Sequence, residues 1–163
     1  MIEETETFGG TWPFDANFVT TSGFRQHYVD EGPRDGEVII CLHGEPTWGY
    51  LYRKFIPPLA QNYRVIVPDH MGFGKSETPQ DRVYTLKSHV ENLAALIEDL
   101  DLNDITFVGQ DWGGLITGSY AIRYPERVKR FVLMNTLFGF GGVSADEERT
   151  DWFKWIAIHY EAG

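Results

Sequence analysis

The stretch around Asp111 carries residue types suited to covalent catalysis. It reads Gly109-Gln110-Asp111-Trp112-Gly113, after a short apolar run and before a helical apolar pattern. A strand, a very tight turn and a helix in this order form a nucleophile elbow, because glycines let the strand and the helix pass close together. The free N–H groups and the positive dipole end of that helix favour an anion at the turn. Asp111 is therefore the candidate nucleophile.

An aspartate at the elbow also predicts the electrophile. A serine needs a base before it attacks an acyl carbon, whereas a carboxylate is already ionised at neutral pH and attacks directly. Displacement of a leaving group from a saturated carbon would give an alkyl ester of Asp111, whose carbonyl carbon is open to water. The alternative is that Asp111 only caps the helix after a strand, and the motif alone does not separate these hypotheses.

A second motif, His43-Gly44-Glu45-Pro46, follows the apolar stretch at residues 37–42. An α/β-hydrolase draws one oxyanion-hole N–H from the loop after its third strand and the other from the residue after the nucleophile. Glu45 and Trp112 are the candidate donors on this basis. A tight turn with a packed His43 is the structural alternative, and both interpretations can hold together.

Alternating strands and helices must position these motifs. Strands are expected at residues 37–42, 63–67, 105–110 and 127–134, and the first two are of the buried kind. Apolar residues at helical spacing predict an amphipathic helix over residues 85–100, with Thr85 as its cap, and another helix is expected to end near Ala60. The alternation predicts the α/β class, a mostly parallel sheet flanked by helices. Residues 12–20 and 24–30 are predicted to pair as a hairpin before it.

The composition indicates one globular unit. The chain has 163 residues, 42% hydrophobic and 15% aromatic, which is enough for one sizeable core and too little for two ordinary domains. Its formal net charge of −10 argues against nucleic acid and anionic membranes as partners. No apolar run approaches membrane-spanning length and residues 1–6 are acidic, unlike a signal peptide, so we expect a cytoplasmic protein.

We expect neither a metal nor a cofactor. The one cysteine, Cys41, excludes an internal disulfide and lies in an apolar run, where it should be buried and inert. The remaining histidines show no metal-ligand spacing and are interpreted as structural: His27, His70, His89 and His159. The glycine-rich stretches at residues 72–76 and 139–142 lack residues that phosphate-loop and dinucleotide motifs require.

Three motifs in this order resemble the haloalkane dehalogenases. They are His43-Gly44-Glu45-Pro46-Thr47-Trp48 with Tyr50-Leu51-Tyr52-Arg53, Pro68-Asp69 with Gly72-Phe73-Gly74-Lys75-Ser76, and Gln110-Asp111-Trp112-Gly113-Gly114. The resemblance runs over residues 24–135 and implies an enzyme that takes a small halogenated alkane and water and releases an alcohol and a halide ion. It implies that Asp111 displaces the halide and that Trp112 donates its indole N–H to it. Glu45 would flank the site and act through its backbone N–H and by orienting water.

The resemblance also predicts what the chain holds beyond the elbow. Asn135 stands where one branch of the family carries the acid partner of its histidine, so the resemblance is to branches whose acid follows a later strand. That acid and the general-base histidine are expected beyond residue 163. Residues 1–138 would then be the N-terminal part of the α/β-hydrolase core, and 139–163 the start of an incomplete helical cap. Trp152 is the candidate second halide donor, Trp155 is the alternative, and core packing could explain both.

Two other functions remain open at this point. An epoxide hydrolase shares the aspartate nucleophile and the fold but uses cap tyrosines to protonate the opening ring. The Glu45-Pro46-Thr47-Trp48 motif and the lack of an identifiable tyrosine pair favour the dehalogenase. A non-catalytic fragment or binding module is the other possibility, because no general base is identified in these residues.

Overall fold

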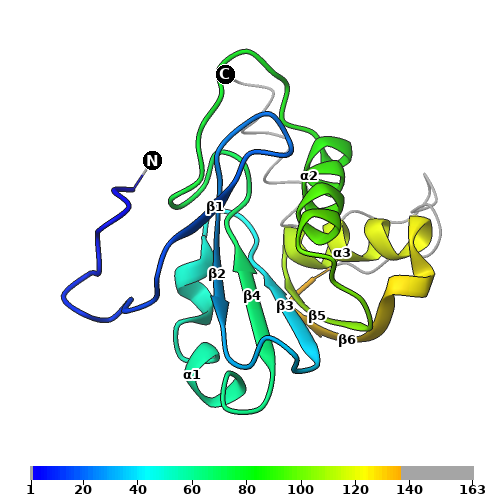
Figure 1. The fold of residues 1–163 in the computed structure, drawn as a ribbon. Coiled ribbons are helices and arrows are strands. Elements are labelled where there is room, and N and C mark those ends of the chain that lie inside the picture. Colours follow the sequence, from blue (N-terminus) through cyan, green and yellow to red (C-terminus); the bar gives the residue numbers. More distant parts are fainter. Residues whose placement is uncertain (1, 137–163) are drawn as a thin grey trace.

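The computed structural model describes residues 2–136, which form one six-stranded sheet with helices on both faces (Figure 1). The strands are β1 Asn17–Val19, β2 Gln26–Glu31, β3 Val38–Leu42, β4 Arg64–Pro68, β5 Ile105–Gln110 and β6 Val128–Met134. Their order across the sheet is β1-β2-β4-β3-β5-β6. From β4 to β6 neighbouring strands are parallel, whereas β1 and β2 are antiparallel to their neighbours. The predicted fold class is confirmed.

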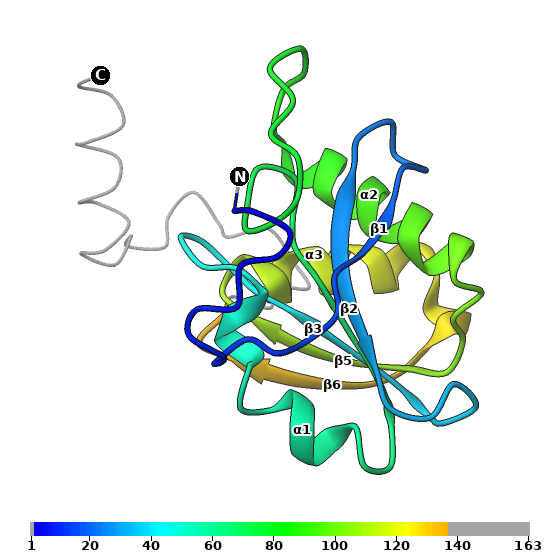
Figure 2. The ribbon, with the colours of Figure 1, turned by 60° about the vertical axis from the view of Figure 1, so that its left-hand side comes forward.

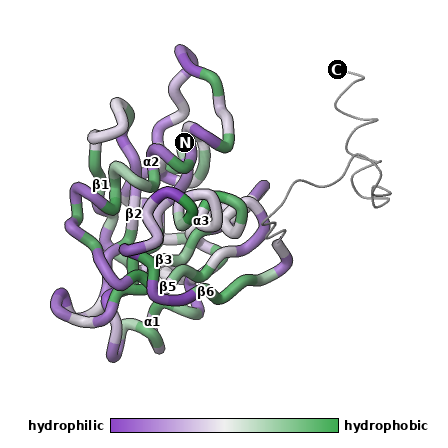
Figure 3. Tube along the Cα trace, turned by 90° about the vertical axis from the view of Figure 1, so that its right-hand side faces the viewer, coloured by the Kyte–Doolittle hydropathy of each residue, from purple (hydrophilic) through white to green (hydrophobic). Residues whose placement is uncertain are grey.

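The central strand β3 is buried along its whole length, and its side chains alternate between two cores. Ile40 and Leu42 belong to the core under α2 (Leu86–Asp99) and α3 (Trp112–Arg123). Ile39 and Cys41 face the opposite core, beside the 3-10 helix η1 (Gly49–Tyr52) and the short α1 (Ile56–Leu59). Figure 2 shows these two groups of helices on opposite sides of the sheet. In Figure 3 hydrophobic stretches follow the inner strands and hydrophilic ones many of the outer turns.

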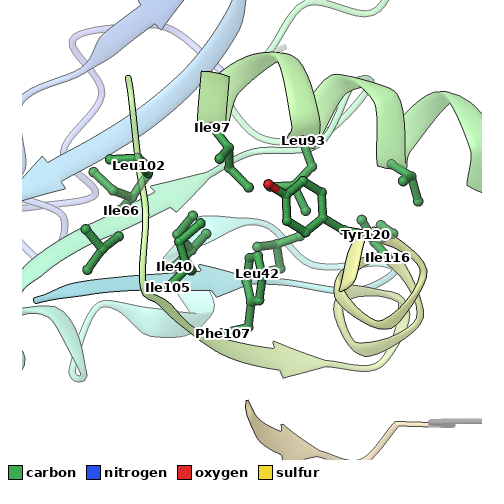
Figure 4. Close-up of a cluster of buried hydrophobic side chains, with 12 residues drawn as sticks. Ile40, Leu42, Ile66, Leu93, Ile97, Leu102, Ile105, Phe107, Ile116 and Tyr120 are labelled. Atoms are coloured by element: carbon green, nitrogen blue, oxygen red, sulfur yellow. The ribbon is translucent and has the colours of Figure 1, made fainter. Parts of the chain in front are cut away.

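The core beneath α2 and α3 fixes the helix that begins at the elbow. Figure 4 shows Leu93 and Ile97 of α2 directed toward Tyr120 of α3 and toward side chains of the sheet. The Phe107 and Tyr120 rings meet nearly edge to face, with centroids 5.6 Å apart. Each fully buried apolar side chain of this size stabilises the fold by about 1.5–3 kcal/mol. Packing, more than local preference, therefore holds α3 against the sheet.

Local sequence signals account for α2 and for the state of Cys41. The Thr85 hydroxyl accepts the Ser88 N–H while the Ser88 hydroxyl accepts the Thr85 N–H, a capping box that confirms the predicted helix start. The Cys41 side chain is fully buried, and burial raises the pKa of its thiol to about 12. The thiol is therefore protonated, as expected for an inert cysteine.

Two predicted elements are shorter than expected. The helix expected to end near Ala60 is divided into η1 and the single-turn α1, because Pro57 and Pro58 have no N–H to continue an upstream helix. The hairpin strand predicted at residues 12–20 is only Asn17–Val19. Trp12 turns away from the ladder and is fully buried in the core beside η1.

At the far edge of the sheet, η2 (Pro125–Arg127) leads into β6, where Val132 and Leu133 are exposed. In residues 2–136 no helix combines the length and apolar character needed to cross a membrane. The predicted cap at residues 139–163, with Trp152, Trp155 and His159, lies outside the described residues.

Candidate active site

Asp111 occupies the strained turn that the glycine pattern predicts. It lies between β5 and α3 with φ 52° and ψ −123°, a conformation that costs a non-glycine residue about 1–3 kcal/mol. A Cβ at Gly109 would lie 2.9 Å from the Gly114 backbone, and one at Gly113 would lie 2.2 Å from the Leu42 carbonyl oxygen. Only glycine fits these close approaches. The backbone geometry of the predicted elbow is thus confirmed.

The Asp111 carboxylate does not serve as a helix cap. Its side chain makes no capping hydrogen bond to α3. Oδ1 instead accepts the Glu45 N–H over 2.9 Å, from the loop after β3. A Cβ at Gly44 would lie 2.4 Å from both Cβ and Oδ1 of Asp111, so the absence of a side chain there makes the approach possible. This geometry disfavours the alternative in which Asp111 merely caps a helix.

Three backbone or hydroxyl contacts hold the elbow itself. The Asp111 N–H donates to the Met134 carbonyl oxygen over 3.3 Å. The Asp111 carbonyl oxygen accepts the Gly114 N–H over 3.0 Å and the Thr136 hydroxyl over 2.6 Å. The strained residue is therefore fixed by α3, by β6 and by the segment that follows β6.

A cavity of about 280 Å³ opens beside the elbow. It is lined by Gly44, Glu45, His70, Phe73, Tyr84, Thr85, Leu86, His89, Trp112 and Ile116. The structure thus brings the predicted Glu45 and Trp112 together next to Asp111. The Trp112 ring is 42% exposed although it is hydrophobic, and it contributes to the wall of this cavity. Within the described residues no cluster of three His, Cys, Asp or Glu side chains could hold a metal ion.

Three histidines form a chain that runs to the cavity wall. His43 Nδ1 contacts the Gly44 carbonyl oxygen at 2.9 Å, and its Nε2 accepts the His70 N–H at 3.0 Å. The His70 Nε2 donates to the His43 carbonyl oxygen at 2.8 Å, and the His70 ring meets the His89 ring at 5.5 Å. Burial lowers the pKa of all three imidazoles, most strongly that of His70, where the charges of the neighbouring histidines add to it. They are neutral at pH 7.

His70 and His89 were predicted as structural, and their place in the cavity wall was not foreseen. One signal could have indicated it for His70. This residue directly follows Pro68-Asp69 at the carboxyl end of the parallel strand β4. Ligands of open α/β sheets bind at that edge. The position of His89 on α2 carries no comparable signal.

Asp69 holds two loops near the site, one at Gly49 and one at Lys75. It is fully buried, and its carboxylate accepts the Gly49 N–H and the Lys75 N–H, each over 2.8 Å. His27 Nδ1 lies 2.8 Å from Oδ2. A Cβ at Gly74 would lie 2.2 Å from that same oxygen, which explains the glycine in this loop. The motif at residues 68–76 therefore has a structural role in the described region.

The family model for the alpha/beta hydrolase fold matches residues 37–158. A haloalkane dehalogenase from Mycobacterium marinum is 46% identical over 154 residues, covering 90% of this chain and 51% of the relative. A cis-3-alkyl-4-alkyloxetan-2-one decarboxylase from Shewanella oneidensis is 43% identical over 127 residues, covering 76% of this chain and 39% of the relative. The chain thus spans about half the length of these curated relatives or less.

Solved structures of enzymes with this fold are also similar to the chain. The haloalkane dehalogenase of Paraglaciecola agarilytica NO2, described as tetrameric, superposes with a TM-score of 0.81 at 39% identity, covering 93% of this chain and 52% of that one. An epoxide hydrolase, CorEH, superposes with a TM-score of 0.77 at 27% identity, covering 90% of this chain and 50% of that one. Both activities that the sequence left open are therefore represented among its structural neighbours.

Proposed function

The chain belongs to the alpha/beta hydrolase fold family, and we propose that the protein hydrolyses the carbon–halogen bond of haloalkanes, releasing an alcohol and a halide ion. One observation carries this proposal. The Asp111 carboxylate makes no capping hydrogen bond to α3 and lies at the elbow, beside the cavity that Trp112 lines. The dehalogenases among its relatives, at 46% and 39% identity, support the same choice.

The proposed first step is displacement at a saturated carbon. One carboxylate oxygen of Asp111 forms a bond to the carbon that bears the halogen, and the carbon–halogen electron pair leaves with the halide. Within the described residues Oδ1 accepts the Glu45 N–H, whereas Oδ2 has no such donor. Oδ2 is therefore the oxygen that attacks, and Oδ1 becomes the carbonyl oxygen of the alkyl ester.

The departing halide needs a hydrogen-bond donor in a partly apolar cavity. The Trp112 indole N–H is such a donor and has no acceptor function, so it favours an anion over a neutral ligand. We assign the second donor to Trp152 on the resemblance alone. A carboxylate beside a halide is unfavourable, so we propose that Glu45, which also lines the cavity, acts through its backbone N–H and by orienting water.

The proposed second step is hydrolysis of the ester. Water attacks the ester carbonyl carbon, and charge develops on Oδ1, where the Glu45 N–H already donates over 2.9 Å. A preorganised donor of this kind is worth about 3–4 kcal/mol of transition-state stabilisation. The backbone N–H of Trp112 is the second proposed donor to Oδ1. Collapse of the tetrahedral intermediate releases the alcohol and restores the Asp111 carboxylate. The base that accepts the water proton is proposed to be a histidine beyond residue 163.

An epoxide hydrolase remains the second candidate, because CorEH is a structural neighbour. Opening an epoxide requires an acid that protonates the ring oxygen. Among the described residues one tyrosine, Tyr84, lines the cavity, and its hydroxyl donates to the Pro79 carbonyl oxygen over 2.9 Å. This hydroxyl is thus engaged outside the cavity, so within the described residues no cavity-lining tyrosine is placed to act as that acid.

The test uses the full-length protein and three substrates: 1-bromobutane, 1,2-epoxybutane and a cis-3-alkyl-4-alkyloxetan-2-one, the last chosen from the name of the Shewanella oneidensis relative. Continuous release of bromide and 1-butanol supports the proposal, and turnover of another substrate alone overturns it. In the Asp111→Asn variant, assayed before any deamidation, bromide release should stop. Intact-protein mass spectrometry should find a butyl adduct on wild type when hydrolysis is slow, and none on the variant. A protein inert toward all three substrates would favour the non-catalytic alternative.

A further inference from the structure

We propose that Thr136 is a positioning residue for Asp111, whose hydroxyl holds the elbow in its reactive conformation. This inference rests on the proposed function, because it assigns a role in attack by the Asp111 carboxylate. Thr136 follows the last sheet strand, and its hydroxyl donates to the Asp111 carbonyl oxygen over 2.6 Å. The contact is made to the backbone of Asp111, and Thr136 is not one of the residues that line the cavity.

Asp111 needs such support because its backbone conformation is intrinsically unfavourable. A residue with φ 52° and ψ −123° keeps this conformation only when its surroundings determine it. Its N–H bond to the Met134 carbonyl oxygen is long, at 3.3 Å, while the bond from the Thr136 hydroxyl is short. The end of β6 therefore contacts the Asp111 N–H and the segment after β6 contacts its carbonyl oxygen, and the Thr136 hydroxyl makes the shorter of these two contacts.

The packing around Thr136 is fitted to this contact. A Cβ at Gly114 would lie 2.1 Å from the Thr136 Oγ1 and 2.5 Å from its Cγ2. Gly114 thus leaves the space that the threonine side chain occupies, and the Gly114 N–H donates to the same Asp111 carbonyl oxygen over 3.0 Å. The Asp111 carbonyl oxygen therefore accepts two hydrogen bonds, one from the Thr136 hydroxyl and one from the Gly114 N–H.

Fixing the carbonyl matters for chemistry because it fixes the peptide plane next to the nucleophile. Rotation of that plane moves the Asp111 Cα–Cβ bond, and with it both carboxylate oxygens relative to the Glu45 N–H. A misplacement of about 1 Å at the reacting atoms costs about a hundredfold in rate. The Asp111 carbonyl belongs to the same peptide group as the Trp112 backbone N–H, so its rotation also moves the second proposed oxyanion donor. We therefore expect the chemical steps to change more than binding of the neutral substrate.

The test compares Thr136→Val with Thr136→Ser in the full-length protein. Valine keeps the volume of threonine and removes the donor, whereas serine keeps the donor and removes the methyl group. Single-turnover alkylation by 1-bromobutane should slow by about ten- to a hundredfold in Thr136→Val, with KM within about twofold of wild type. Thr136→Ser should stay within about threefold of wild type. A purely structural methyl contact predicts the reverse order of the two variants and would overturn the inference.

A second measurement does not depend on dehalogenation. Hydrogen exchange at the Gly114 amide, which shares the Asp111 carbonyl, should accelerate in Thr136→Val and remain slow in Thr136→Ser. If wild type fails to turn over 1-bromobutane, the proposed function fails, but this exchange still decides whether the hydroxyl fixes the elbow. Equal exchange in Thr136→Val and wild type overturns the positioning role whatever the activity is.

Discussion

The Glu45 amide nitrogen lies 2.9 Å from Oδ1 of Asp111, although 66 positions separate the two residues in the chain. The contact exists because β3 and β5 are parallel neighbours, so the loop after one strand and the turn after the other meet at the same edge of the sheet. The donor is a backbone N–H, whose position depends on how closely residues 43–46 approach the elbow.

Gly44→Ala should abolish most of the activity without unfolding the protein. The new methyl group would lie 2.4 Å from Cβ and Oδ1 of Asp111, so the carboxylate must move. We expect a loss of about a hundredfold in the alkylation rate and a stability cost of about 1–3 kcal/mol. Gly9→Ala is the control, because its methyl group would meet nothing within 4 Å. Its only cost is the backbone strain of an alanine at a φ of 65°. Wild-type turnover in Gly44→Ala would refute the close approach.

Trp112→Phe should keep the fold and weaken halide binding. Phenylalanine keeps an aromatic ring in the cavity wall but has no N–H, and one hydrogen bond to an anion is worth about 1.5–3 kcal/mol. The inhibition constant of bromide should therefore rise about ten- to a hundredfold. Trp48→Phe is the matched control, since Trp48 packs against Trp12 with ring centroids 5.0 Å apart and does not line the cavity. Equal bromide inhibition in the two variants would contradict the assignment.

Asp69→Asn should destabilise the fold. The carboxylate accepts the Gly49 and Lys75 N–H groups, and an amide would direct its own NH₂ toward one of these donors. We expect a loss of about 1–3 kcal/mol in the free energy of unfolding, measured by urea denaturation. Asp35→Asn, at an exposed turn, should leave that free energy within about 0.5 kcal/mol of wild type. A stable Asp69→Asn protein would show that the buried carboxylate is dispensable.

Stability should fall as the pH drops below about 6.5, the ordinary pKa of histidine. Burial lowers the folded-state pKa of His43, His70 and His89, so the unfolded chain binds protons that the folded protein does not. The stabilisation that comes from keeping these imidazoles neutral is fully present above the pKa of histidine in the unfolded chain. It is lost as the pH falls toward the lower pKa values of the folded state. Each excess proton costs about 1.4 kcal/mol per pH unit.

Urea denaturation between about pH 7.5 and 5.5 isolates this effect, because most carboxylates stay ionised there. His70→Gln should flatten the pH dependence even if it lowers stability at every pH, since it removes the most perturbed imidazole. An unchanged slope in that variant would mean that other groups cause the loss.

Sequence reasoning succeeded where a local pattern determines the geometry. The elbow follows from Gly109 and Gly113, because no other residue fits the contacts that a strand and a helix make at such a turn. The start of α2 follows from Thr85, whose capping box needs only residues three apart. The same reasoning overestimated the strand near Trp12, since burial of that indole against distant aromatic rings outweighed local strand preference.

The parts of the site that sequence reasoning missed depend on contacts between distant segments. His89 reaches the cavity because α2 packs across the sheet, which no local pattern reveals. Thr136 meets Asp111 because the register of β5 and β6 sets Gln110 opposite Met134. Such contacts depend on the register of the sheet and on the packing of helices, so they become visible only when the strands are assembled.

The order of the strands also bears on how the site arises during synthesis. From β4 onward each new strand pairs with one that precedes it in the chain, so the sheet can grow as the polypeptide emerges from the ribosome. Asp111 itself must wait, because Met134 and Thr136 supply two of the contacts that hold its turn. In the described residues, the turn at Asp111 is therefore fully held only after β6 and Thr136 have been added to strands that are already paired.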